Sequence, residues 1–143
     1  MDKKLILPND LLLGEVAAVL AEGREAVITP TGQSMLPFIR GGSDRVVLRR
    51  LDTLSVGDIV LAHIGDRYVM HRIIALDGDA VTLMGDGNLR GTEHCSRGEI
   101  IGTVVEILRP DGRSHKPSTG RAWRALRPLR RYILFIYKHL FLH

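Results

Sequence analysis

Several features that would fix the class of this protein at once are missing from its sequence. Cys95 is the only cysteine, which excludes a disulfide within the chain and leaves the redox compartment open. The apolar run at residues 5–7 ends at Pro8 and is too short for the core of a signal peptide or a membrane-spanning helix. The pair His94-Cys95 stands alone, whereas a zinc site needs three or four converging ligands. We therefore expect no spanning segment, no metal and no other cofactor.

Acidic residues are missing from one segment. Residues 121–138 contain no acid and six basic residues, Arg121, Arg124, Arg127, Arg130, Arg131 and Lys138. The net charge of the whole chain is only +4, so the remainder is close to neutral. A general nucleic-acid-binding surface is therefore not expected, and the basic excess belongs to the C-terminal segment.

The composition is otherwise that of a globular domain. The chain has 143 residues, of which 45% are hydrophobic, enough for one self-sufficient core. Apolar residues recur at helical spacing over residues 10–21, after Asn9 or Asp10 as a cap and before a terminating Gly23. These signals predict a short N-terminal helix.

From residue 25 onward the pattern changes to short strands. We predict strands over residues 25–29, 45–49, 58–62, 67–76, 80–84 and 99–108. Gly65-Asp66 and Asp77-Gly78-Asp79 lie where turns would join neighbouring strands, and Pro110-Asp111-Gly112 would end the last one. Many short strands with glycine-rich turns predict a mainly β fold, either a barrel or a coiled sheet.

The C-terminal part differs in composition from this body, residues 1–108. Residues 109–120 are polar and are predicted to be a linker, and residues 121–143 form a basic amphipathic tail that Pro128 should kink or break. Such a tail is typical of a helix lying in the membrane interface, where each Lys or Arg near anionic lipid adds about 1 kcal/mol. The alternative is a solvated helix packed on its own domain.

Three segments carry residues suited to nucleophilic catalysis. Ser34 lies in Thr31-Gly32-Gln33-Ser34-Met35-Leu36-Pro37, and a serine hydroxyl needs a base within hydrogen-bond reach. His71, inside a predicted strand, can accept a proton near neutral pH. Asp86, in Gly85-Asp86-Gly87-Asn88, can orient such a histidine. Taken singly, each residue has a plain structural alternative, as a turn serine, a core histidine or a turn-forming aspartate.

Together, the three segments resemble the nucleophile, general-base and G-D-x-N boxes of the type I signal peptidases, over roughly residues 25–108. His71 stands where the common bacterial branch has lysine, so the chain is similar to the histidine-base branch. The related LexA-like self-cleaving repressors share G-x-S-M but use lysine. The resemblance implies a signal-peptidase/LexA-like coiled β-sheet barrel with a short N-terminal helix and a C-terminal basic amphipathic helix.

The same resemblance implies a serine endopeptidase that cleaves a leader-type or signal-type segment with small residues before the cut. In that mechanism Ser34 attacks the peptide carbonyl, His71 is the general base and Asp86 orients it. The backbone amides of Gln33 and Ser34 would face the oxyanion, and Glu93 is a further candidate acid.

The expected partner is a peptide or preprotein substrate. Residues 121–143 would add peripheral membrane contact, and a cytoplasmic location is the alternative. Two other functions stay open. The protein could cleave itself, as LexA-like regulators do, or it could be an inactive binding module that keeps the fold.

Overall fold

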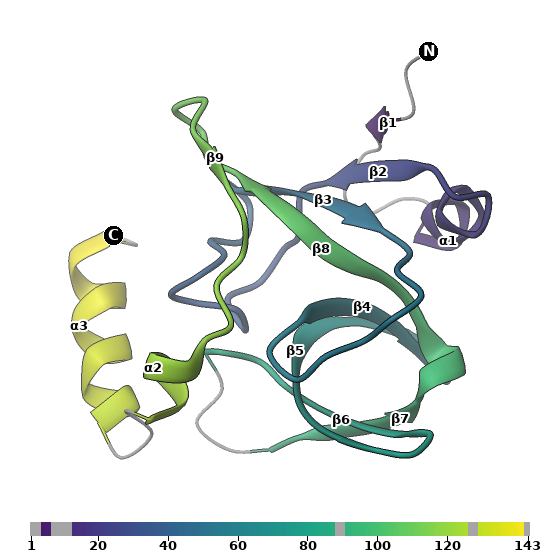
Figure 1. The fold of residues 1–143 in the computed structure, drawn as a ribbon. Coiled ribbons are helices and arrows are strands. Elements are labelled where there is room, and N and C mark those ends of the chain that lie inside the picture. Colours follow the sequence, from purple (N-terminus) through teal and green to yellow (C-terminus); the bar gives the residue numbers. More distant parts are fainter. Residues whose placement is uncertain (1–3, 7–12, 88–90, 126–128, 142–143) are drawn as a thin grey trace.

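A computed structural model describes residues 4–6, 13–87, 91–125 and 129–141. Within them the strands form a single nine-stranded sheet in the order β1-β2-β3-β8-β4-β5-β6-β7, with β9 beside β8 (Figure 1). The elements are β1 (Lys4–Ile6), α1 (Leu13–Ala21), β2 (Glu25–Ile28), β3 (Arg45–Arg49), β4 (Ile59–Ile64), β5 (Arg67–Asp77), β6 (Ala80–Met84), β7 (Glu93–Ser96), the 3-10 turn η1 (Arg97–Glu99), β8 (Ile100–Leu108), β9 (Ser114–His115), α2 (Arg121–Ala125) and α3 (Arg130–Phe141).

The sheet curls at β8, which pairs with both β3 and β4. β3 pairs with β8 from Thr103 to Leu108, and β4 pairs with β8 from Ile100 to Thr103. Each pairing contains a register shift, between Val47 and Leu48 in β3 and between Leu61 and Ala62 in β4. Such irregularities bend a strand and increase its twist. The result is a curled, largely antiparallel half-barrel, which confirms the predicted mainly β fold.

Among the residues that the structure describes, the largest of three hydrophobic clusters joins α1 to strands β2, β3, β4 and β8. α1 buries Val16, Val19 and Leu20, which pack in one cluster with strand residues such as Leu48 and Val104. The predicted helix over residues 10–21 is confirmed from Leu13 onward, whereas its predicted cap lies outside the described residues. α1 thus closes one end of the half-barrel.

Each of the six predicted strands corresponds to an observed strand, but the pattern did not predict β1, β7 or β9. β1 has three residues and pairs in parallel with β2. β7 carries Glu93 and His94, which are poor strand formers, and is held by pairing with β6. β9 falls within residues 109–120, the predicted linker, and pairs with the end of β8.

The C-terminal helices α2 and α3 lie side by side beyond β9 (Figure 1). Trp123 and Leu134 are buried with Leu36 in a separate hydrophobic cluster, against which the partly buried Phe38 packs. One face of the predicted tail therefore packs on the body, while Pro128 lies outside the described residues. In the part of the chain that the structure describes, no helix is both long and apolar enough to cross a membrane.

The packing of α1 predicts that Leu20→Ala and Val56→Ala differ clearly in their effect on the free energy of unfolding. Leu20 is fully buried, so Leu20→Ala should lower the free energy of unfolding by about 2–5 kcal/mol, through lost burial and the cavity left behind. Val56 is 47% exposed, so Val56→Ala should change it by less than about 0.5 kcal/mol. Urea unfolding followed by circular dichroism measures both, and equal losses would contradict the role assigned to α1.

Candidate active site

Ser34 lies in a loop that leaves β2 and returns to β3. The loop is closed at its base by a hydrogen bond from the Gly42 N–H to the Pro30 carbonyl, 2.8 Å. Met35 and Leu36 are buried beneath the loop, as expected for the apolar residues that follow the serine. The N–H of Leu36 donates to the Gln33 carbonyl at 3.2 Å, which makes a tight turn around Ser34. We call residues 31–42 the serine loop.

Ser34 and His71 line the same cavity. Its volume is about 260 Å³, and its walls come from the serine loop and from residues 67–71 of β5. The lining residues outside this pair are largely apolar or small, including Met35, Tyr68 and Met70. The fold therefore brings together two sequence-predicted residues that are 37 positions apart.

Glu93, not Asp86, is the carboxylate that the structure places on the His71 ring. Glu93 Oε1 is hydrogen-bonded to His71 Nδ1. Register explains the contact. Side chains alternate along strands, so His71 shares a face with Ile73, and Glu93 shares one with Cys95. Ile73 and Cys95 pack in one cluster, so the two polar side chains meet beyond its edge.

This pairing leaves Nε2 as the ring nitrogen that can face the cavity. His71 is 8% exposed and the Glu93 side chain is 22% exposed, so the pair is partly shielded from water. A carboxylate on Nδ1 fixes the ring orientation and the tautomer and stabilises the imidazolium that forms when Nε2 takes a proton. The contact therefore has the geometry of a base and its orienter.

Asp86 has a different partner from the one expected. Its two carboxylate oxygens accept hydrogen bonds from Arg72, from Nε at 2.8 Å and from Nη2 at 2.6 Å. Both side chains are buried, at 0% exposure for Arg72 and 3% for Asp86. A bidentate carboxylate–guanidinium pair thus engages both oxygens of Asp86, and the orienting role predicted for Asp86 stays a prediction.

Residues 85–87, which we call the Asp86 segment, nevertheless support the serine loop through their backbone. The N–H of Gly87 donates to the Ser34 carbonyl at 2.7 Å. A Cβ atom at position 87 would lie 2.6 Å from the Gln33 carbonyl oxygen, so only glycine allows this close approach. The Gly-Asp-Gly sequence thus acts as a backbone clamp on the residues around Ser34.

Gln33 and Ser34 were the candidates for the backbone oxyanion site. Within the described part of the chain, neither amide donates to a backbone carbonyl outside the helices and strands. Their carbonyls, in contrast, are engaged by Leu36 and Gly87, which restrains the direction of the peptide planes. Ser34 lines the cavity, and the oxyanion role of the two amides stays a prediction.

Other chemistry finds less support around this cavity. No group of three or more His, Cys, Asp or Glu that could hold a metal ion occurs among the residues that the structure describes. Burial and the negative charge of Glu99 raise the pKa of the Cys95 thiol, so its reactive thiolate is disfavoured. Ser34, the nucleophile that the sequence predicts, lines this cavity together with His71.

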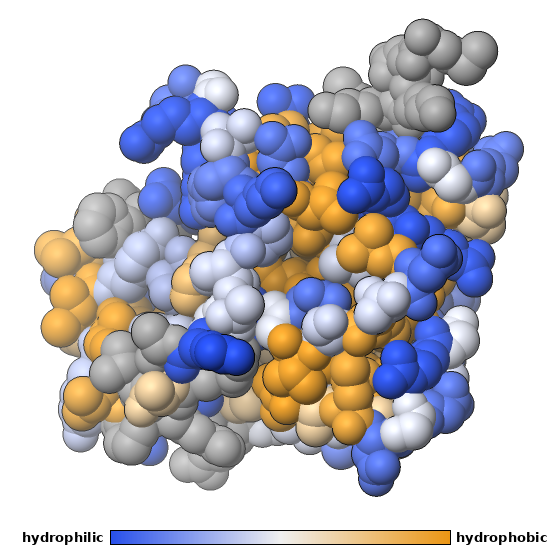
Figure 2. Space-filling model, in the orientation of Figure 1, coloured by the Kyte–Doolittle hydropathy of each residue, from blue (hydrophilic) through white to orange (hydrophobic). Residues whose placement is uncertain are grey.

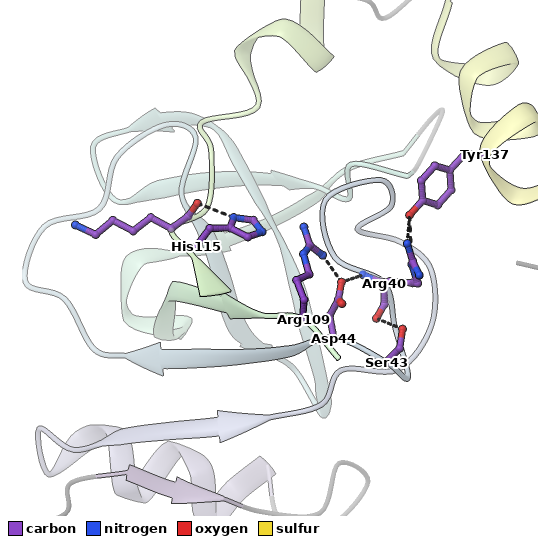
Figure 3. Close-up of polar contacts among 7 residues, drawn as sticks. Arg40, Ser43, Asp44, Arg109, His115 and Tyr137 are labelled. Carbon is purple, nitrogen blue, oxygen red and sulfur yellow. Dashed lines mark hydrogen bonds and ion pairs between the residues drawn. The ribbon is translucent and has the colours of Figure 1, made fainter. Parts of the chain in front are cut away.

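Asp44 stabilises the far end of the serine loop. Its Oδ2 accepts a hydrogen bond from the Arg40 backbone N–H at 2.7 Å and pairs with Arg109 of the segment after β8 (Figure 3). Asp58 likewise accepts from the Ser55 N–H at 2.9 Å. Both aspartates therefore stabilise turns.

Arg72 and Trp123 are the two residues of this region that sequence reasoning missed. In the sequence Arg72 directly follows His71, and Trp123 lies in the basic tail. Arg72 is a charged residue inside an apolar strand pattern, and this signal could have marked it as a buried, paired cation. No comparable signal in the sequence links Trp123 to the Asp86 segment.

A buried and an exposed Asp–Arg pair predict unequal effects on stability. Asp86→Asn leaves the Arg72 charge buried without its counter-ion and should lower the free energy of unfolding by about 3–5 kcal/mol. Asp111→Asn breaks the exposed pair with Arg113 and should leave it nearly unchanged. Thermal and urea unfolding at pH 7 compare the two variants, and an equally mild loss in Asp86→Asn would contradict a buried ion pair.

Comparison with known proteins agrees with this geometry. The family model described as Peptidase S24-like matches residues 3–105, well over half of the chain. No curated protein matches the chain. The family model supports the broader LexA and signal-peptidase superfamily rather than the histidine-base signal peptidases in particular. Because the match spans the cavity, the β5 strand and the Asp86 segment together, the chain belongs to the Peptidase S24-like family, whose members are serine peptidases that act on peptides.

Proposed function

We propose that this protein is a serine endopeptidase in which Ser34 is the nucleophile, His71 the general base and Glu93 the residue that orients the base. The observation that carries the proposal is the Glu93–His71 hydrogen bond at the wall of the cavity that Ser34 also lines. A nucleophile, a base and an acid on the far nitrogen of that base make up the set that peptide hydrolysis by serine requires.

In this mechanism His71 Nε2 takes the Ser34 hydroxyl proton as Oγ attacks the peptide carbonyl. The resulting oxyanion lies against the amides of Gln33 and Ser34. His71 then gives the proton to the leaving amine, which departs as the acyl–serine ester forms. A water molecule, deprotonated by His71, hydrolyses that ester and restores Ser34. Glu93 stays ionised throughout and stabilises the imidazolium form of His71.

The proposed substrate is an extended leader-type or signal-type segment with small residues before the cut. The preference for small residues is what the family resemblance implies, and the cavity of about 260 Å³ between nucleophile and base offers space for a peptide segment. The β5 residues along its wall offer a neighbouring strand for an extended peptide. Trimming of such segments is the form of the activity that we favour.

A second candidate is self-cleavage, which the family match favours because LexA-like proteins belong to the same superfamily. The two activities use the same catalytic residues and differ only in where the cut segment lies. An inactive binding module of this fold is the third candidate. A serine-directed acylating probe separates it from the others, since labelling of Ser34 requires an activated hydroxyl.

The catalytic assignment predicts graded losses of activity. Ser34→Ala and His71→Ala should each abolish cleavage of a peptide library and probe labelling, with the fold retained. Glu93→Gln keeps the size of the side chain but removes its charge, and should lower kcat by about 10²- to 10⁴-fold. Mass spectrometry of the library, and of the purified chain incubated alone, records external and self-cleavage. Unchanged activity in the Ser34→Ala or His71→Ala variant would reject the mechanism.

We also propose that α3 places the enzyme on an anionic membrane surface. Its outward side exposes Tyr132, Phe135, Ile136 and Leu140, each more than half exposed. The opposite side packs on the body through Leu134 and its neighbours. No acid follows Asp111 in the sequence, and α3 also exposes the basic residues Arg131 and Lys138. Figure 2 shows the hydrophobic surface at the left edge of the molecule, over α3.

The membrane proposal predicts binding to phosphatidylserine-containing vesicles that weakens with salt. The Phe135→Ser and Ile136→Ser double variant should lower the partition coefficient about tenfold or more, because two apolar side chains no longer insert. Val56→Ser, at an exposed site outside α3, serves as the control. Vesicle co-sedimentation measures all three proteins. Equal binding of the double variant and the control would reject a role for the α3 surface.

A further inference from the structure

The segment that follows the family-matched region makes close contacts with the catalytic loops. The match ends at residue 105, whereas Ser118, Gly120 and Trp123 contact Arg72 and the Asp86 segment. We call residues 118–125 the C-terminal latch. Its position suggests a role in the site that the family match does not describe.

Trp123 is the central residue of the latch. It is 5% exposed, and its Nε1 donates to the Asp86 carbonyl at 2.6 Å. Its ring packs with Leu36 and meets the Phe38 ring edge-on, with 6.3 Å between ring centroids. One side chain therefore contacts the serine loop and the Asp86 segment at the same time.

Arg72 holds the start of the latch. Its Nη1 donates to the Ser118 carbonyl at 2.7 Å and to the Gly57 carbonyl at the same distance. Gly120 has a φ of +71°, and a Cβ atom there would lie 2.8 Å from the guanidinium of Arg72. The latch thus fits against Arg72 with no room for a larger residue.

A second contact joins the helix after the latch to the same loop. Nε and Nη2 of Arg40 donate to the Tyr137 hydroxyl at 3.3 and 3.2 Å, and Tyr137 lies on α3 (Figure 3). The backbone N–H of Arg40 is meanwhile held by Asp44. The C-terminal segment therefore reaches the serine loop at Leu36, Phe38 and Arg40.

These contacts reach the neighbourhood of Ser34 through both the serine loop and the Asp86 segment. Leu36, which packs on Trp123, is two residues after Ser34. Asp86, whose carbonyl Trp123 binds, precedes Gly87, whose N–H donates to the Ser34 carbonyl. The position of the Ser34 hydroxyl relative to His71 thus depends on two loops that a single indole ring holds together.

We infer that the C-terminal latch is an integral part of the catalytic unit and that Trp123 is a positioning residue for Ser34. The inference rests on the proposed peptidase function for its effect on activity. Trp123 is not among the residues that line the cavity, so its loss changes the alignment of Ser34 and His71 rather than the substrate contacts. The expected signature is a lower kcat with little change in KM.

The test compares Trp123→Ala and Trp123→Phe with Val19→Ala. Trp123→Phe keeps an aromatic ring but loses the N–H donor. Val19→Ala removes buried apolar volume from α1, so it lowers stability without touching the latch. Two readouts are taken well below the unfolding temperatures: the rate at which a fluorophosphonate probe labels Ser34, and amide hydrogen exchange at Gly87 by NMR.

We expect labelling to slow about 10- to 100-fold in Trp123→Ala and less in Trp123→Phe, with a matching rise in Gly87 exchange. Val19→Ala should change neither. Gly87 exchange that stays at the wild-type level in Trp123→Ala overturns the inference. An equal slowing in Val19→Ala also overturns it, because the effect would then be a general loss of stability.

The two proposals fail in different ways. A wild-type protein that the probe does not label at Ser34 rejects the peptidase function, and Gly87 exchange still decides whether the latch holds the two loops. A labelled wild type with equally fast labelling of Trp123→Ala rejects the latch alone. If Trp123→Ala does not fold, Trp123→Phe supplies the same comparison, since its ring fills most of the same space.

Discussion

The buried guanidinium of Arg72 is the group on which the arrangement of the site depends. It binds both oxygens of Asp86 and the carbonyls of Gly57 and Ser118, and it lies 5.0 Å from the centre of the Phe38 ring. A buried cation is tolerated only when its donors are satisfied. Arg72 therefore brings together Gly57, which precedes β4, the Asp86 segment and the C-terminal latch. These three parts of the chain meet next to His71 in β5.

This arrangement assigns two carboxylates to two tasks. Asp86 neutralises Arg72 and, through the backbone beside it, supports Ser34. The Glu93 side chain is more exposed than that of Asp86 and contacts the ring of His71. The separation is physically reasonable, because a carboxylate already engaged by a guanidinium is a weaker acceptor for an imidazole N–H than one without that partner. The backbone of the Asp86 segment and the side chain of Glu93 therefore complement each other in the proposed mechanism.

The C-terminal segment joins two proposed activities in one element. Its inner side packs on the serine loop through Trp123, Leu134 and Tyr137, and its outer side exposes apolar and basic residues. An amphipathic helix can use both sides only when the inner contacts fix its orientation. Those inner contacts also fall beyond the region that the family model matches, which ends at residue 105.

The sequence by itself determined the mainly β class, a short N-terminal helix, and the LexA and signal-peptidase superfamily that Ser34, His71 and the Asp86 segment indicate. These features follow from local periodicity, turn chemistry and short motifs. Only the tertiary structure decided that Glu93 contacts His71, that Asp86 pairs with Arg72 and that Trp123 bridges two loops. The first contact depends on strand register, the second on a charge that must be neutralised once buried, and the third on packing between segments far apart in the chain. None of these is encoded in the spacing of neighbouring residues.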